Sequence, residues 1–152
     1  MSDRLKRIIV ILAIIAGIVG SACAIVNLLY YNKEGKSVEI GASSFATQLN
    51  AIYADASAYL GGTITLEGIY TNSEIDGKVY HSVYRLYQDA EGSQSYVGIE
   101  FVSADNSYPE KGAWVKVSGT LKSYSENEGN YLQLVDATVV EKAVRGSEIV
   151  SR

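Results

Sequence analysis

The sequence is poor in the residues that build disulfides, metal sites and many catalytic centres. It holds one cysteine, Cys23, one histidine, His81, and one proline. A single cysteine excludes an intrachain disulfide, so a folded domain must be held together by its hydrophobic core alone. One histidine and one cysteine also cannot supply the three or four ligands of a zinc site. We therefore predict no metal and no cofactor.

Catalytic machinery is lacking as well. His81 lies between Tyr80 and Ser82 in a segment with strand character, and no nucleophile elbow accompanies it. We expect His81 to face solvent or to lie on an edge strand. The glycines fall in strands and turns and form no phosphate-binding loop. We predict that the chain is not an enzyme and has no catalytic residues.

One long uncharged segment dominates the N-terminal part. Residues 8–31 carry no charged side chain, and at about 1.5 Å rise per residue a helix of this length spans ~36 Å, against a hydrocarbon core of ~30 Å. Tyr30 and Tyr31 close the segment, where aromatic rings prefer the membrane interface. We predict one transmembrane helix over residues 8–31, seated in the lipid bilayer of the cell membrane.

The flanking charges predict the orientation of this helix. Three basic residues precede it, whereas Lys33 and Lys36 follow it and are diluted by Glu34. Positive charge favours the cytoplasmic side. We expect a single-pass protein with residues 1–7 as a cytoplasmic N-terminus and with its C-terminal domain extracytoplasmic.

Two processing alternatives remain open for the same segment. A signal peptidase could cut after Ala22 or Ala24, although the apolar run is longer than the usual signal-peptide core. Residues 20–23 also resemble a bacterial lipoprotein box with Cys23 as the lipidated residue. Gly20 replaces the usual branched residue of that box, and the apolar run continues beyond the cysteine, so an ordinary membrane-helix cysteine is preferred.

The rest of the chain favours β structure after one helix. Residues 32–42 are polar and glycine-containing and are predicted to be a linker. From Ser44 to residue 60 the apolar residues follow a helical stripe, which ends at Gly61 and Gly62. The apolar period then changes to two residues, with a hairpin signal at Asp76-Gly77. The predicted strands are 63–70, 79–87, 96–102, 113–121 and 131–141, followed by a flexible tail over 143–152.

Two of the predicted strands share the same spacing of glycine and aliphatic residues. Gly61 and Gly112 are each followed by two inward aliphatic residues and then by a strand glycine, Gly68 and Gly119, at identical spacing. A glycine inside a strand permits a sharp bend or a bulge. Two strongly bent strands among five predict a small closed barrel instead of a flat sheet.

The pattern resembles the oligonucleotide/oligosaccharide-binding (OB) fold, a five-stranded Greek-key barrel. The resemblance covers about residues 43–142 and extends to OB-type domains of bacterial exported proteins, of putative permease accessory proteins and of the anticodon-binding-like group. It implies an all-β fold, a five-stranded OB-like barrel preceded by a short amphipathic helix, beside the transmembrane helix. The usual helix between strands three and four and the cysteine pair of some relatives are missing. The segments that carry the resemblance are Tyr59-Leu60-Gly61-Gly62-Thr63-Ile64-Thr65-Leu66-Glu67-Gly68 and Gly112-Ala113-Trp114-Val115-Lys116-Val117-Ser118-Gly119-Thr120-Leu121.

Charge argues against nucleic acid as the partner. Between Ser37 and Lys142 six basic residues face fourteen acidic ones, a net charge of −8. Phosphate backbones are bound by basic grooves. We predict no nucleic-acid partner and a membrane or envelope protein partner instead, for which the chain would be a membrane-anchored, non-catalytic binding or accessory module.

The alternatives are a small-ligand or glycan-binding sensor, single-stranded nucleic-acid binding, which the charge disfavours, and an unidentified enzymatic role. OB barrels bind ligands on strands two and three and on the loops that join strands one to two and four to five. The competing interpretation is that most of the tyrosines fill the barrel or support cross-strand pairs. The predicted ligand- or partner-binding residues are Tyr80, Tyr84, Arg85, Tyr87 and Tyr96.

Overall fold

A computed structural model describes residues 35–150 of the chain. The predicted membrane segment, residues 8–31, lies outside these residues. Within 35–150 no helix combines the length and the apolar character needed to cross a bilayer.

The described part of the chain has one α-helix and five long strands, with a two-residue strand at either end. Short 3-10 turns precede and follow the helix, at Ala42–Ser44 and Ala56–Ala58. The elements are β1 (Val38–Glu39), α2 (Phe45–Ala54), β2 (Thr63–Ile75), β3 (Lys78–Gln88), β4 (Gln94–Ser103), β5 (Trp114–Glu126), β6 (Gly129–Glu141) and β7 (Ile149–Val150).

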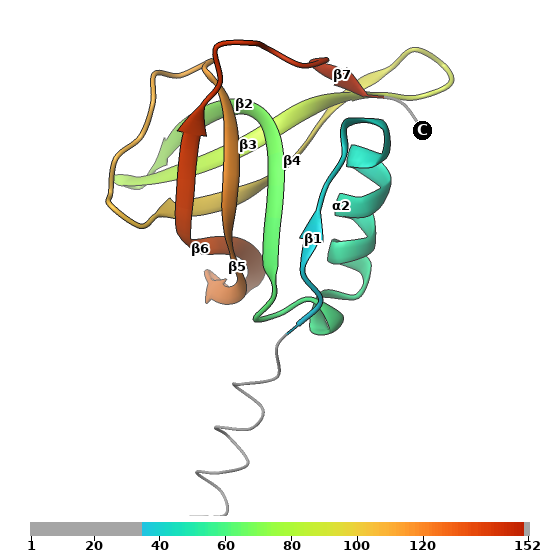
Figure 1. The fold of residues 1–152 in the computed structure, drawn as a ribbon. Helices are drawn as coiled ribbons and strands as arrows, with labels where there is room; N and C mark the ends of the chain where they lie inside the picture. Colours follow the sequence, from blue (N-terminus) through green and yellow to red (C-terminus); the bar gives the residue numbers. More distant parts are fainter. Residues whose placement is uncertain (1–34, 151–152) are drawn as a thin grey trace, which may run out of the picture. The chain divides into compact units, whose positions relative to one another are not determined.

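The five long strands close into a barrel. Each strand pairs antiparallel with its neighbours, except that β4 and β6 run parallel, and the pairing of β2 with β3 closes the circle β2-β5-β6-β4-β3. Figure 1 shows these strands wrapped around one interior with α2 beside the barrel. This is the five-stranded Greek-key barrel of the OB fold. The predicted barrel and the single short helix that precedes it are confirmed.

Turn and strand glycines bend the chain as the sequence predicts. Asp76 and Gly77 both have positive φ, 51° and 78°, which is the backbone of a tight β2–β3 hairpin turn. Gly119 lies where the β5–β6 register shifts, between Ser118 and Thr120. A Cβ on Gly119 would approach Leu134 Cβ to 3.0 Å, a tight contact that favours glycine at the bulge.

Helix α2 contributes one face to the barrel core. Phe45, Ala46, Leu49 and Ile52 recur at helical spacing, and all four are buried. The helix ends at Ala54, earlier than the predicted residue 60, and the chain continues through the 3-10 turn at Ala56–Ala58. The largest fully buried side chains from the strands are Trp114, Tyr70, Phe101, Ile64, Leu66, Leu121, Leu134, Val83 and Val115.

Both segments predicted to be loose contain residues that pack on the barrel. In the predicted linker, β1 pairs with β2 in parallel and Ile40 is buried. In the predicted flexible tail, β7 pairs in parallel with β3 and Val150 is buried. Sequence patterning misses two-residue strands because they are too short to show a period, and only the neighbouring long strand stabilises them.

Candidate ligand-binding face

The outward sides of β2, β3 and β4 form one surface, which we call the outer face. In antiparallel strands directly opposed residues share a side, and Thr71, Ser82 and Glu100 are such a row across the three strands. The next row along places Tyr84 opposite Gly98. The row is tight, because a Cβ on Gly98 would lie 2.7 Å from Tyr84 Cβ. The Tyr84 side chain therefore depends on glycine as its cross-strand partner.

Two tyrosine rings meet on this face. Tyr84 and Tyr96 lie edge to face, with ring centroids 5.1 Å apart and an interplanar angle of 70°. Tyr96 is 76% exposed, the most exposed aromatic side chain of residues 35–150. A large flat ring that remains open to solvent on a rigid sheet can stack on a planar ligand.

A cavity of about 630 Å³ adjoins this tyrosine pair. It lies between the outer face and helix α2, whose Tyr53 hydroxyl donates a hydrogen bond of 3.0 Å to the Gly98 carbonyl. Burial is the main reason that the pKa of Tyr53 is raised, and the Glu100 carboxylate raises it further. Glu100 and Lys111 are the charged residues of the cavity lining. The lining is thus aromatic with a few polar groups, as in ligand sites.

A second cavity, of about 410 Å³, lies where β3 and β4 separate. The β3–β4 pairing ends at Ser82 and Glu100, and the β3 residues before Ser82 pair only with β2. Tyr80 and Tyr124 line this cavity together with Lys78. Glu100 lines both cavities, so they adjoin at its side chain. We call the two cavities together the aromatic groove.

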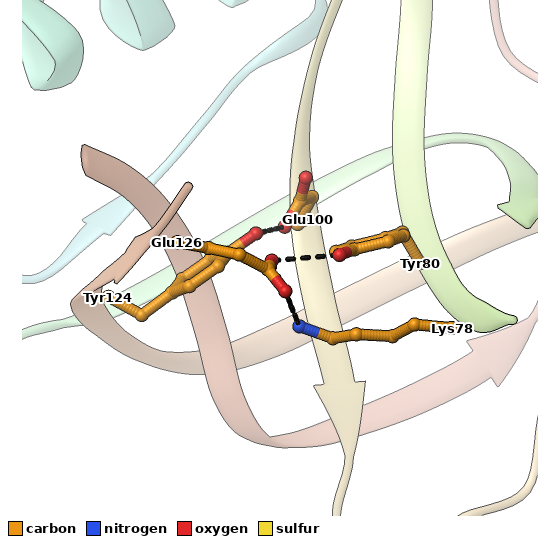
Figure 2. Close-up of polar contacts among 5 residues, drawn as sticks. All are labelled: Lys78, Tyr80, Glu100, Tyr124 and Glu126. Carbon is orange, nitrogen blue, oxygen red and sulfur yellow. Dashed lines mark hydrogen bonds and ion pairs between the residues drawn. The ribbon is translucent and has the colours of Figure 1, made fainter. Parts of the chain in front are cut away.

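A polar network links the β2–β3 and β5–β6 hairpins beside the groove (Figure 2). The Glu126 carboxylate accepts hydrogen bonds from Lys78 Nζ, at 2.9 and 3.0 Å, and from the Tyr80 hydroxyl, at 2.8 Å. These bonds, that of Lys78 first, lower the pKa of Glu126. The Tyr124 hydroxyl donates to Glu100 Oε2 at 2.5 Å. Burial first, and then the Glu100 carboxylate, raise the pKa of Tyr124, so its hydroxyl remains a donor at neutral pH.

His81 is half-buried, lines the second cavity and lies in the part of β3 that pairs only with β2. It lies on the inner side of β3, where its ring stacks on Tyr108 with centroids 3.4 Å apart. Its Nδ1 is 2.8 Å from the Tyr70 hydroxyl, which itself accepts a hydrogen bond from Asn72. Either the Tyr70 hydroxyl or the Nδ1–H donates in this bond, depending on the tautomer of His81. Burial lowers the pKa of His81.

Of the predicted site residues, Tyr80, Tyr84 and Tyr96 lie along the groove. Arg85 does not, because it is 2% exposed and points inward, where it lies between the Phe45 and Trp114 rings. Arg85 donates to the backbone carbonyls of Glu67 and Ser147. The buried carbonyls and rings hold its charge, so Arg85 is a structural residue.

Tyr87 does not line either cavity of the groove. It packs against the hydrophobic core and pairs with Val150 of β7. Tyr84 and Tyr87 are three residues apart, so they face opposite sides of the strand.

Sequence reasoning missed several residues of the groove, among them Glu100, Tyr124, Tyr53 and Lys111. Tyr124 lies beyond the predicted strand 113–121, which was too short, because β5 continues to Glu126. The alternation of Lys122, Tyr124 and Glu126 is the signal that could have found it. Tyr53 and Lys111 come from a helix and a loop far apart in the sequence, and only the closed barrel brings them to the groove.

The charge of the groove differs from that of the domain. Its charged lining consists of Lys78, Lys111 and Glu100, a net charge of +1. Most of the fourteen acidic residues lie elsewhere on the surface. Within residues 35–150 no group of three or more histidine, cysteine, aspartate or glutamate side chains is placed to hold a metal ion.

The chain is similar to two solved structures. One is the dimeric structure of the N-terminal domain of PriB protein from Thermoanaerobacter tencongensis, with 25% identity over 53% of this chain and 97% of that chain and a TM-score of 0.30. The other is the mitochondrial single-stranded DNA binding protein Rim1 from S. cerevisiae, with 18% identity over 53% and 96% of the two chains and a TM-score of 0.31. No protein-family model matches the chain, and no curated protein matches it.

The similarity to Rim1 corrects the predicted function and partners. The sequence excluded nucleic acid and assigned a membrane-anchored extracytoplasmic module with a membrane or envelope partner, whereas Rim1 is a single-stranded DNA binding protein. The exclusion rested on the net charge of the whole domain, which does not describe the charge of the groove. At these TM-scores the likeness assigns no ligand.

Proposed function

We propose that the chain is a non-catalytic binding protein for single-stranded nucleic acid, whose bases stack in the aromatic groove. The observation that carries the proposal is the solvent-open Tyr84–Tyr96 pair on a rigid sheet, beside a cavity of about 630 Å³. Ligand pockets range from about 300 to 1,000 Å³. OB barrels bind extended ligands on this part of the barrel.

Stacking supplies most of the proposed affinity. Each base stacked on an aromatic side chain contributes about 1–3 kcal/mol, and every base has a π-face, so the contact tolerates different sequences. The groove offers Tyr84 and Tyr96 in the first cavity and Tyr80 and Tyr124 in the second. An extended strand can therefore place successive bases along the face and cross the barrel at Glu100.

The charges along the groove permit this ligand. Glu126 is ion-paired with Lys78 and accepts a further bond from Tyr80, so its charge is locally balanced. Lys111 donates to the Asn72 carbonyl, which leaves two of its three N–H groups to approach a phosphate. With Lys78 balanced by Glu126, the remaining charges of the groove are Lys111 and Glu100, so the groove is close to neutral on an acidic domain.

Fluorescence anisotropy with a labelled single-stranded oligonucleotide tests the proposal on the full-length chain. Tyr84→Ala and Tyr96→Ala remove one stacking surface each, and we expect either change to weaken binding by about 5- to 150-fold. Tyr84→Phe and Tyr96→Phe are the matched controls, because they keep the ring, and they should retain most of the affinity. Circular dichroism of each variant verifies that the fold is intact.

Two results would contradict the proposal. One is the absence of oligonucleotide binding by the unmodified chain, most plainly if an oligosaccharide of similar length binds in its place. The other is oligonucleotide binding that survives both alanine substitutions unchanged, since the strand would then lie on a different surface.

A further inference from the structure

We infer that Glu100 gives the aromatic groove a preference for cytosine over thymine, an inference that rests on the proposed function. Glu100 lies in the middle of β4, opposite Ser82 of β3, and its side chain lines both cavities. It is the only acidic residue in the lining of either cavity. A base held beside the Tyr84–Tyr96 pair therefore meets this carboxylate at its edge.

The hydrogen-bonding state of Glu100 leaves one oxygen for a ligand. Its Oε2 accepts the hydrogen bond from Tyr124, as Figure 2 shows. Within residues 35–150 no hydrogen bond to Oε1 is formed. The Tyr124 bond fixes the orientation of the carboxylate, and a carboxylate held in this way can only accept further hydrogen bonds. The groove thus presents Glu100 Oε1 as a positioned hydrogen-bond acceptor, and a base that binds beside it needs a hydrogen-bond donor at that point.

Cytosine and thymine differ in the group that position 4 presents to this acceptor. Cytosine carries an amino group at position 4, which donates to a carboxylate, whereas thymine carries a carbonyl oxygen there. The one donor on this edge of thymine, N3–H, lies between two carbonyl oxygens, so a thymine that approaches Glu100 brings a carbonyl oxygen against the carboxylate, acceptor against acceptor. Both bases are pyrimidines that offer a π-face to the tyrosines, so the polar difference between them lies in this contact.

Lys111, in the loop that precedes β5, adds a hydrogen-bond donor to the same cavity. It lines the same cavity as Glu100 and has N–H groups beyond the one that bonds Asn72. A base with an amino donor and a carbonyl acceptor on one edge satisfies the carboxylate and the ammonium together. Cytosine has both groups on its Watson–Crick edge. Good polar contacts of this kind discriminate between bases about 5- to 150-fold.

Competition between oligo-dC and oligo-dT of equal length, measured at pH 7.5 on the full-length chain, tests the inference. We expect oligo-dC to bind at least fivefold more tightly. Glu100→Gln offers an amide that can donate as well as accept, so it should remove the preference, mainly by strengthening oligo-dT binding. Glu128→Gln is the matched control, because it removes the same charge from the exposed β5–β6 turn without touching either cavity, and it should keep the preference.

The outcomes separate this inference from the proposed function. Equal binding of the two oligonucleotides, with the expected loss in Tyr84→Ala, overturns the role of Glu100 and leaves stacking intact. A preference that persists in Glu100→Gln also overturns it. Failure of both oligonucleotides to bind removes the proposed function itself.

Discussion

At the scale of single residues, the side of the strand decides what each tyrosine does. Tyr70 is 1% exposed and belongs to the core, whereas Tyr96 is 76% exposed on the outer face. Both tyrosines lie in long strands of the barrel. The buried Tyr70 ring packs in the core and its hydroxyl forms a hydrogen bond with His81, whereas the exposed Tyr96 ring remains available to a ligand. Composition alone cannot separate these two roles.

His81 makes the stability of the domain depend on pH in a predictable direction. Its pKa in the folded chain lies below the ordinary value of about 6.5, because burial disfavours the charged ring. Acidification therefore protonates the unfolded chain first, so stability is fully present above pH 6.5 and falls as the pH approaches the folded-state pKa. We expect the melting temperature to drop between pH 7.5 and 5.5.

The control is His81→Phe, which keeps a ring over Tyr108 and removes the titrating group. Because the chain has no other histidine, this variant should show a nearly flat melting temperature across the same pH interval. Its absolute stability is not the readout, since Tyr70 loses its hydrogen bond with His81. If His81→Phe retains the full pH dependence, the histidine is not responsible.

At the scale of elements, the close approach of β3 and β4 holds the outer face together. Gly98 is the point of closest approach, because a Cβ there would lie 2.4 Å from the Val83 carbonyl oxygen and 2.7 Å from Tyr84 Cβ. Both atoms belong to β3, which pairs with β4, so they cannot move without disturbing that pairing. Position 98 therefore requires glycine because β3 lies so close, although the backbone conformation at this position would allow other residues.

Gly98→Ala should destabilise the domain by about 1–3 kcal/mol, because overpacking forces the two strands apart. Urea denaturation measures the change. Gly41→Ala is the matched control: its Cβ would meet only Ser44 Oγ, at 3.6 Å, and its φ of −75° suits alanine. That variant should be neutral or more stable by about 0.4–1 kcal/mol. Equal effects of the two substitutions would show that the β3–β4 contact is not limiting.

The β5–β6 hairpin shows why element length matters for the site. It extends to Glu126 and Gly129, several residues beyond the predicted strand ends, and this extra length carries Tyr124 and Glu126 to β3 and β4. The cross-strand pairing continues to the tip, with Tyr124 opposite Tyr131. Polar alternation at a hairpin end looks like a turn in sequence, whereas in the barrel it forms one wall of the groove.

At the scale of the whole molecule, the barrel separates the charge of the groove from that of the remaining surface. The groove is lined by Lys78, Lys111 and Glu100, although the domain as a whole is acidic. Binding that rests on stacking and on at most two lysines, of which Lys78 is already ion-paired with Glu126, should depend only weakly on salt. For single strands the slope of log K against log salt is about −0.7 for each phosphate neutralised.

We therefore expect a slope no steeper than about −1.4 for oligonucleotide binding, from titrations at several salt concentrations. Lys111→Gln should reduce its magnitude by about 0.7. Lys142→Gln is the control, because Lys142 follows β6 outside both cavities, and it should leave the slope unchanged. A much steeper slope would mean that phosphates contact a basic surface other than the groove.

The sequence alone determined the class of this fold, because the signals involved are local. Period-two alternation, the Asp76-Gly77 turn and the strand glycines predict five bent strands after one helix, and each of these features acts within a few residues. The short strands β1 and β7 escaped prediction, since two residues cannot display a period. The predicted membrane segment lies outside residues 35–150 and stays a prediction.

Only the tertiary structure decided which residues form the groove. Arg85 and Tyr87 entered the predicted site because they neighbour Tyr84 in the sequence, yet the strand pleat turns them inward. Glu100 and Tyr124 come from different strands and meet only because β4 separates from β3 at the point where the β5–β6 hairpin reaches over it. Contacts between distant segments, and the local charge they create, depend on barrel closure, which no window of sequence contains.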